Sequence, residues 1–154
     1  MDIAIEKAKD TGVGMVSMGN GRHLGMAGYH AAKALDHDMI GVCMTSSSSG
    51  VVPTFASKAV LGTNPIAIGA PSGGKYPIVL DIATAVAPEG KVRDYRNRQK
   101  EVPAGWILDH QGRPTTNPND LYEPAPGGSL QPLGGSAGYK GFGLSVMIDI
   151  LAGG

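Results

Sequence analysis

The amino-acid sequence predicts an α/β fold, because short apolar runs typical of buried strands alternate with segments whose apolar residues recur at helical spacing. Buried strands are predicted at Ile66–Ala70 and Ile78–Ile82, with a turn at Ser72–Gly74 between them. A helix is predicted at Ala27–Leu35, and it leads into a further buried strand at Met39–Met44.

The first 45 residues also predict how the strands pair. A helix over Ile3–Lys9 is expected to stop at Gly12, and the apolar run Val13–Met18 is predicted to be a strand. A glycine-rich loop follows and leads to the helix that begins at Ala27. The order of strand, loop, helix and strand favours a parallel pair joined by a crossover helix.

The second half of the chain is predicted to be less regular. The charged run Arg93–Glu101 is typical of a solvated helix end, and Trp106–Asp109 is predicted to be a short strand followed by a turn. The segment Arg113–Gly128 is rich in Pro, Asn and Gly and is expected to form irregular surface. An apolar helix is predicted at Phe142–Ala152.

The composition excludes several classes of protein. Of the 154 residues, 42% are hydrophobic and 17% are charged, and the net charge is zero, so no basic excess predicts binding to nucleic acid or to an anionic membrane. We expect no signal peptide and no membrane-spanning segment. Cys43 is the only cysteine and lies in an apolar run, which predicts a buried thiol and a reducing, cytoplasmic location.

Both ends of the sequence predict a fragment. The helix at Ile3–Lys9 has nothing before it, and the apolar helix at Phe142–Ala152 is followed at once by the end of the chain. A core helix at the very end of a domain leaves its packing partners missing. We therefore expect residues 1–154 to be one part of a single larger domain, truncated at both ends.

Common motifs for phosphate, metal and nucleophile chemistry do not match. Gly19, Gly21 and Gly25 lie between a predicted strand and a helix, but their spacing is G-x-G-x-x-x-G. The next strand ends in Thr45, where a dinucleotide-binding domain of the Rossmann type would carry a ribose-binding acid, so we reject that interpretation. The sequence also lacks a G-x-S-x-G elbow and any Cys/His cluster with metal-ligand spacing, so no metal site is predicted.

The stretch Leu61–Val92 carries polar residues just outside its two predicted strands. Asn64 lies in the polar stretch before the first strand, and Asp81 and Thr84 lie at the end of the second. This layout fits a ligand rim on a rigid sheet. It also fits an ordinary strand pair with polar turns, and the spacing alone favours that interpretation.

Two further loops carry groups that suit an anionic ligand. The hydroxyl-rich loop Thr45–Gly50 is either a flexible turn or a set of hydroxyl and N–H groups that hold phosphate or ribose oxygens. Lys140 lies in a glycine-rich loop at the start of the last helix, where the helix dipole disfavours a cation. A surface lysine and a lysine that binds an anion together with the free N–H groups are both consistent with this position.

His23 is the histidine best placed for proton transfer. It lies beside Arg22 in a glycine-rich loop that precedes a helix, where an imidazole can project into a cleft. Histidine titrates near neutral pH and is the usual proton donor or acceptor in enzymes. The other three histidines lie on a predicted helix, at its end or in a turn, and are expected to be structural or solvated.

Several longer motifs resemble those of the type-2 malate/L-lactate dehydrogenase family of NAD(P)-dependent oxidoreductases, and the resemblance runs essentially from end to end. The motifs are H-x-G-x-x-G-Y at His23–Tyr29, M-I-G-V-x-M-T at Met39–Thr45, L-G-T-N-P-I-A at Leu61–Ala67, L-D-x-A-T at Leu80–Thr84, G-K-V at Gly90–Val92, G-W-x-L-D-x-x-G-x-P-T-T at Gly105–Thr116 and G-Y-K-G-F-G-L at Gly138–Leu144.

The resemblance implies a non-Rossmann NAD(P)-binding fold with a mixed sheet and flanking helices, a homodimer, and hydride transfer between NAD or NADP and a small 2-hydroxy or 2-oxo acid. It assigns proton transfer to His23. It assigns cofactor contacts to the following residues: Ser47, Asp81, Ile82, Ala83, Lys140 and Gly141.

The departures from the family pattern concern both chemistry and completeness. Arg22 stands where the family has a small or polar residue, and it is a candidate clamp for the substrate carboxylate. The family's upstream serine-histidine-glycine motif has no counterpart here. The leading hypothesis is therefore the central cofactor-binding part of a 2-hydroxyacid dehydrogenase, inactive alone. The alternative is a non-catalytic domain of the same fold that binds a nucleotide or another anion.

Overall fold

The computed structural model describes residues 1–21 and 23–153, so the candidate clamp Arg22 lies outside the described residues. The chain divides into two compact units. Unit 1 comprises Met1–Thr45 and Pro65–Ile82, and unit 2 comprises Ser46–Asn64 and Ala83–Gly153. The predicted α/β class is confirmed, because each unit combines helices with a small sheet.

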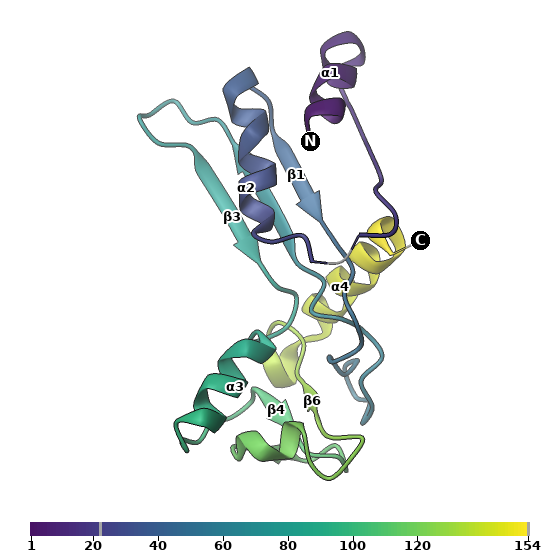
Figure 1. Cartoon of the computed structure of the whole chain (residues 1–154), viewed down its shortest axis with the longest axis vertical. Coiled ribbons are helices and arrows are strands. Elements are labelled where there is room, and N and C mark those ends of the chain that lie inside the picture. Colours follow the sequence, from purple (N-terminus) through teal and green to yellow (C-terminus); the bar gives the residue numbers. More distant parts are fainter. Residues whose placement is uncertain (22, 154) are drawn as a thin grey trace. The chain divides into compact units, whose positions relative to one another are not determined.

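Unit 1 is a three-stranded antiparallel sheet in the order β1-β2-β3, with α2 on one face (Figure 1). The register places Gly41 opposite Gly69 and Ala67 opposite Asp81. The elements are α1 (Asp2–Thr11), α2 (Ala27–Ala32), the 3-10 helix η1 (Lys33–His37), β1 (Gly41–Met44), β2 (Ile66–Ala70) and β3 (Ile78–Ile82).

Two glycines let α2 lie close to the sheet. A Cβ at Gly41 would collide with the carbonyl oxygen of Ala31 on α2, and a Cβ at Gly69 would lie 3.3 Å from the same oxygen. The small core beneath the helix consists of Ala27, Ala31 and Ala67, and Cys43 packs against it. Cys43 is only half-buried, and this partial burial raises the pKa of its thiol.

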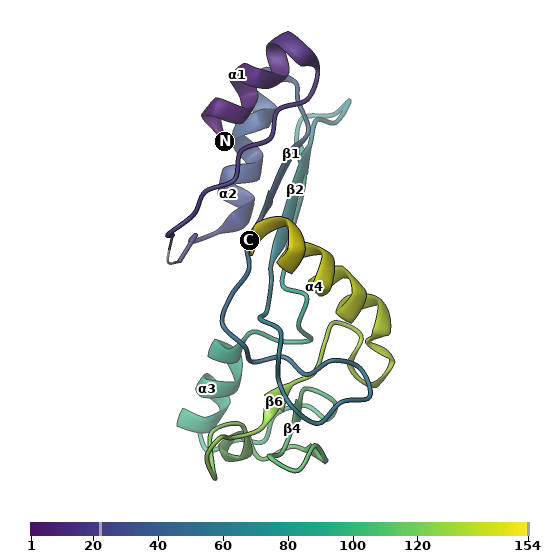
Figure 2. The same cartoon turned by 90° about the vertical axis from the view of Figure 1, so that its right-hand side faces the viewer.

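The N-terminal helix ends as the sequence predicts. Gly12 closes α1 in the left-handed conformation, with φ of 82°, and its N–H donates to the carbonyl of Ala8. Figure 2 shows α1 beside the helical segment that begins with α2, and the ion pair between Lys33 and Asp2 joins the two segments. This pair lowers the pKa of Asp2 and raises the pKa of Lys33.

Three expectations for unit 1 are wrong. Val13–Met18 forms no strand, because it runs as an exposed segment past α1, where a Cβ at Gly14 would collide with the carbonyl of Ala4. The predicted parallel pair is therefore absent, and β1 pairs antiparallel with β2 instead. The third strand has the predicted bounds, but it is exposed, because within the sheet only β2 lies beside it and one face of the sheet is left uncovered by α2.

Unit 2 is built around a core of larger side chains. Val51, Val92, Ile107 and Leu130 are at most 2% exposed and pack together, with Trp106 and other partly buried aromatic residues around them. A second small sheet has the order β5-β4-β6. The elements are α3 (Glu89–Asn97), β4 (Ile107–Leu108), β5 (Pro114–Thr115), the 3-10 helices η2 (Pro118–Leu121) and η3 (Gly135–Ala137), β6 (Ser129–Leu130) and α4 (Tyr139–Ala152).

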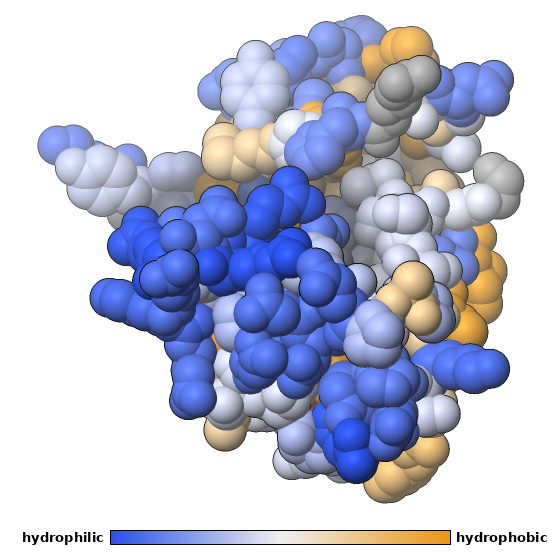
Figure 3. Space-filling view, turned by 60° about the horizontal axis from the view of Figure 1, so that its bottom comes forward, coloured by the Kyte–Doolittle hydropathy of each residue, from blue (hydrophilic) through white to orange (hydrophobic). Residues whose placement is uncertain are grey.

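Most predictions for unit 2 are confirmed. The charged run begins within α3, the short strand after Trp106 is β4, and the apolar C-terminal helix is α4. The segment expected to be irregular contains the short elements β5 and η2 and two cis peptide bonds before proline. The part of unit 2 that carries α3 and β4 faces the viewer in Figure 3, and hydrophilic residues predominate on it.

Candidate functional site

His23 lies on an exposed loop of unit 1 that leads into α2. The backbone N–H of Gly25 donates to His23 Nδ1 at 2.9 Å. Because this contact occupies the Nδ1 lone pair, a neutral imidazole in this arrangement carries its proton on Nε2. The ring of His30, on α2, contacts the carbonyl of Leu24 through Nε2 at 3.1 Å and ties the same loop to the helix.

Asp81 uses one carboxylate oxygen to hold the start of α2. The N–H of Gly28 donates to Asp81 Oδ2 at 2.7 Å, which satisfies a first-turn donor of the helix. A Cβ on Gly28 would lie only 2.8 Å from that oxygen, so a larger residue would displace the Asp81 carboxylate. Ile82 follows as the half-buried last residue of β3. Asp81 and the His23 loop are thus connected through the first turn of α2.

Ser47 lies in unit 2, on the exposed hydroxyl-rich loop. Its Oγ accepts from the N–H of Thr63 at 2.9 Å and lies 3.2 Å from Thr63 Oγ1. Its own N–H donates to Asn64 Oδ1 at 3.0 Å. A Cβ on Gly62 would collide with Ser47, so the two loops approach each other closely. The Ser47 loop is therefore held by specific contacts, which are not expected of a flexible turn.

Asn64 and Thr84 are structural partners that the sequence analysis placed on a polar rim without a role. Asn64 is completely buried, and its Nδ2 donates to the carbonyl of Ser145 and to Asp149 Oδ1 on α4. Thr84 is also completely buried, and it follows the half-buried Ala83. Its Oγ1 donates to the carbonyls of residues 63 and 64. The signal that could have found both is a polar side chain within a run of small and apolar residues.

Lys140 lies in the first turn of α4, as predicted, and is exposed. Its Nζ lies 5.8 Å from the centroid of the Tyr139 ring, and none of the ion pairs found among the described residues includes it. The first turn of the helix contains no acidic residue. A cationic side chain therefore lies at the N-terminal end of a helix, which is the end that favours anions.

Gly141 is buried against the carbonyl of Leu133, where a Cβ would collide. The predicted site residues therefore fall into two groups. His23, Asp81 and Ile82 belong to unit 1, whereas Ser47, Ala83, Lys140 and Gly141 belong to unit 2. Within unit 2, the network around Asn64 connects the Ser47 loop, the segment at Ala83 and helix α4.

A polar pocket of unit 2 contains none of the predicted residues. It has a volume of about 480 Å³ and lies between the end of α3 and η2. Arg96 lines this pocket, donates to Asn119 Oδ1 and forms an ion pair with Glu123, so its positive charge is already balanced within the protein. The pocket is lined by Arg96, Asn97, Gln99, Lys100, Glu101, Asn117, Pro118 and Asn119.

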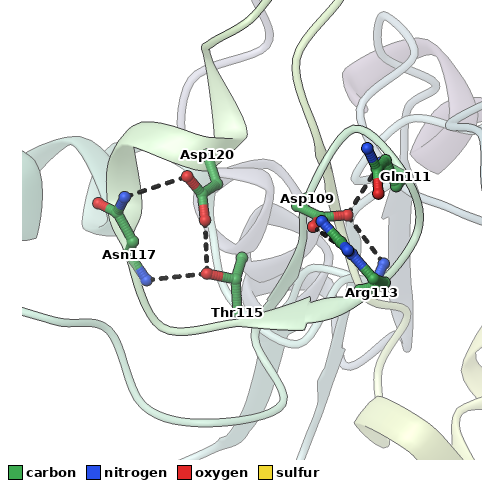
Figure 4. A network of polar contacts seen from close by, with 6 residues as sticks. All are labelled: Asp109, Gln111, Arg113, Thr115, Asn117 and Asp120. Atoms are coloured by element: carbon green, nitrogen blue, oxygen red, sulfur yellow. Dashed lines mark hydrogen bonds and ion pairs between the residues drawn. The ribbon is translucent and has the colours of Figure 1, made fainter.

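The polar network in Figure 4 stabilises a turn and a short helix. Asp109 accepts from the N–H groups of Gln111 and Arg113 and pairs with the Arg113 side chain. The backbone contact with Arg113 contributes most to the lowered pKa of Asp109. Nearby, Asn117 Oδ1 accepts from the N–H of Asn119 and caps η2.

Among residues 1–21 and 23–153, no three His, Cys, Asp or Glu side chains are grouped so that they can hold a metal ion. No helix in the same residues has both the length and the apolar character needed to cross a membrane.

Comparison with known proteins identifies the family. The family model for malate/L-lactate dehydrogenase matches residues 1–154, and the chain belongs to this family. A malate dehydrogenase from Pyrococcus abyssi is 47% identical in an alignment of 157 positions that covers 99% of this chain and 42% of that protein. An NAD(+) ureidoglycolate dehydrogenase from Escherichia coli strain K12 is 37% identical over 153 residues, which is 99% of this chain and 41% of that protein.

The fold comparison agrees with the sequence comparison. The crystal structure of a malate dehydrogenase from Entamoeba histolytica superposes with a TM-score of 0.89 at 40% identity, over 97% of this chain and 43% of that one. The family resemblance and the fold class are therefore confirmed. This chain spans about two fifths of the length of the curated relatives that it matches.

Proposed function

We propose that this chain supplies the central cofactor-binding part of a dehydrogenase that transfers hydride between NAD or NADP and a small 2-hydroxy or 2-oxo acid. Its membership of the malate/L-lactate dehydrogenase family carries this proposal. The two relatives described above act, by their names, on malate and on ureidoglycolate, which are both 2-hydroxy acids. We therefore assign this chain a substrate class and not one substrate.

The donors of unit 2 fit the polar parts of a nicotinamide dinucleotide. Lys140 is cationic, is exposed and lies at the N-terminal end of α4, which suits a phosphate. Ser47 and Thr63 present hydroxyl groups 3.2 Å apart, which suits ribose or phosphate oxygens. When bound, the cofactor supplies the hydride chemistry, and the protein supplies orientation and proton transfer.

In this proposal His23 acts on the oxygen of the reacting carbon. With Gly25 N–H bound to Nδ1, the Nε2–H group is a donor and can polarise the carbonyl of a 2-oxo acid. To accept a proton at Nε2 during alcohol oxidation, the ring must carry its other proton on Nδ1, so the Gly25 contact must open. The loop that carries His23 is exposed, which leaves room for this change.

Cofactor binding is tested on the 154-residue chain by fluorescence titration with NADH and with NADPH. We expect saturable binding that Lys140→Ala weakens by about tenfold, the effect of losing one charge-assisted contact of about 1.4 kcal/mol. Lys91→Ala, on the exposed surface of α3, serves as the matched control. Binding that is unaffected by Lys140→Ala would remove Lys140 from the site, and a folded chain that binds neither nucleotide would contradict the proposal for this chain.

Turnover is tested in a chimera in which this chain replaces the matching segment of the Pyrococcus abyssi malate dehydrogenase. We propose that the chain alone is inactive because it spans only 42% of that enzyme. In the chimera, His23→Asn is expected to lower kcat at least ~100-fold while leaving cofactor affinity unchanged. A chimera that binds cofactor but shows no turnover with His23 intact would favour the non-catalytic alternative. The homodimer and the cytoplasmic location stay predictions.

A further inference from the structure

Asn64 is a completely enclosed polar side chain in the network around the predicted cofactor loops. Its residue exposure is 0%. Oδ1 accepts from the N–H of Ser47 at 3.0 Å, and Nδ2 donates to the carbonyl of Ser145 at 3.1 Å and to Asp149 Oδ1 at 3.3 Å. One amide thus joins the Ser47 loop to helix α4.

The main chain around Asn64 reaches a third segment. Thr84 Oγ1 donates to the carbonyl of Asn64 at 3.0 Å and to the carbonyl of Thr63 at 3.1 Å. The N–H of Thr84 donates to the same Thr63 carbonyl at 2.8 Å. These bonds hold the chain directly after Ala83. Asn64 itself has φ of 29°, in the left-handed region that asparagine tolerates better than most residues.

We infer that Asn64 is a positioning residue for cofactor binding, which holds the Ser47 loop, the segment at Ala83 and helix α4 in one arrangement. This inference rests on the proposed function, because those three segments carry the predicted cofactor contacts of unit 2. The amide suits the role, since it offers an acceptor to one partner and two donors to the others. A hydrophobic side chain of similar size would leave the Ser47 N–H without this partner.

A role in positioning differs from a purely structural role in what it predicts for affinity. If Asn64 only stabilises unit 2, a variant at this position should bind cofactor as well as any other folded variant of equal stability. If Asn64 positions the loops, affinity should fall more than stability accounts for, and it should recover when the hydrogen-bond pattern is restored.

The test uses the complementary substitutions Asn64→Asp and Asp149→Asn in the 154-residue chain. Asn64→Asp keeps an acceptor for Ser47 but places an oxygen against the Ser145 carbonyl and the Asp149 carboxylate. We expect the affinity for NADH, measured by fluorescence titration, to fall at least ~10-fold. Asp149→Asn alone retains an acceptor for Asn64 Nδ2 and should bind as the unchanged chain does.

The double variant exchanges donor and acceptor between the two positions. The amide introduced by Asp149→Asn can then donate to the carboxylate introduced by Asn64→Asp, which restores this contact but not the one with the Ser145 carbonyl, so the affinity should recover in part, by at least ~threefold over Asn64→Asp alone. Ile107→Val, in the core on β4, is the control for stability, because it lowers the thermal midpoint without touching the network. Thermal unfolding of every variant is measured beside the titration.

The outcomes separate this inference from the function on which it rests. If the unchanged chain is folded and binds neither NADH nor NADPH, the proposed function fails and the inference fails with it. If the unchanged chain binds but Asn64→Asp binds as tightly as Ile107→Val, only the inference is overturned. A double variant that binds no better than Asn64→Asp alone also overturns it. Should Asn64→Asp not fold, Thr84→Val removes the hydroxyl contacts at similar volume, and undiminished affinity would contradict the inference.

Discussion

Each of the two units of this chain is stabilised internally, and the two are stabilised in opposite ways. In unit 1, helix α2 lies on the sheet through glycines and alanines, and a Cβ at Gly41 or Gly28 would run into an atom of the neighbouring element. In unit 2, the core consists of larger side chains such as Ile107 and Leu130, bordered by Trp106. The difference teaches that close backbone contact and side-chain volume are alternative ways to join a helix and a sheet.

This comparison predicts that the two units are sensitive to opposite substitutions. Where backbones meet through glycine, adding an atom forces the layers apart. Where large side chains fill the space, removing atoms leaves a cavity. Trp106 is the only tryptophan and lies in unit 2, so its fluorescence reports on that unit, whereas far-UV circular dichroism reports on both.

The largest effect is expected for Ile107→Ala. Ile107 is completely buried at the centre of the core of unit 2. Its truncation removes apolar contacts and leaves a cavity, so the free energy of unfolding should fall by about 3–4 kcal/mol. Urea unfolding followed by Trp106 fluorescence measures the change. A loss below about 1 kcal/mol would mean that the core closes around the gap and that volume does not hold unit 2 together.

A smaller effect, from an added methyl group, is expected for Gly41→Ala. The new Cβ would meet the Ala31 carbonyl, so α2 must move away from the sheet. We expect the free energy of unfolding measured by circular dichroism to fall by about 1–3 kcal/mol. The free energy of unfolding measured by Trp106 fluorescence should change less.

The matched control adds the same methyl group to unit 2. Gly90 lies in α3, where nothing lies within 4 Å of an added Cβ. Because alanine favours a helix over glycine, Gly90→Ala should stabilise the chain by about 0.5 kcal/mol. If Gly41→Ala behaves like Gly90→Ala, close backbone contact does not limit unit 1.

The smallest effect concerns charge at the surface of unit 2. The Arg113 N–H, with smaller contributions from the Arg113 side chain and the Gln111 N–H, holds the pKa of Asp109 below its usual value of 3.8. When a carboxyl group has a lower pKa in the folded state than in the unfolded state, it stabilises the fold. This stabilisation is fully present at pH values above the unfolded-state pKa, and it is lost as the pH falls through the folded-state pKa. Asp109→Asn should therefore lower the thermal midpoint at about pH 7, and the difference from the unchanged chain should shrink below about pH 4.

The corresponding acid of unit 1 sharpens this comparison. The pKa of Asp2 is lowered mainly by the Lys33 side chain, through an exposed ion pair. Salt screens such a pair, so about 1 M NaCl should reduce the effect of Asp2→Asn more than the effect of Asp109→Asn. Equal salt dependence of the two variants would show that the backbone contacts of Asp109 contribute little.

The elements that carry the candidate site residues could be predicted from the sequence, but the contacts that support those residues could not. The sequence placed Lys140 at the start of the last helix, and the structure agrees. It did not indicate that the Asp81 carboxylate accepts from Gly28 N–H, which lies 53 positions away. Nor did it indicate the contact of Asn64 with Ser145, which spans 81 positions. Such partners depend on how distant segments pack.

The sequence by itself determined the local elements of this protein. Hydrophobic spacing located β2, β3 and α4, and Gly12 marked the end of α1, because these features depend on neighbouring residues. Only the tertiary structure decided that Val13–Met18 is not a strand, that β1 pairs antiparallel with β2, and that β3 is exposed. A strand exists only where another strand offers it hydrogen bonds, and that partner is set by the path of the whole chain.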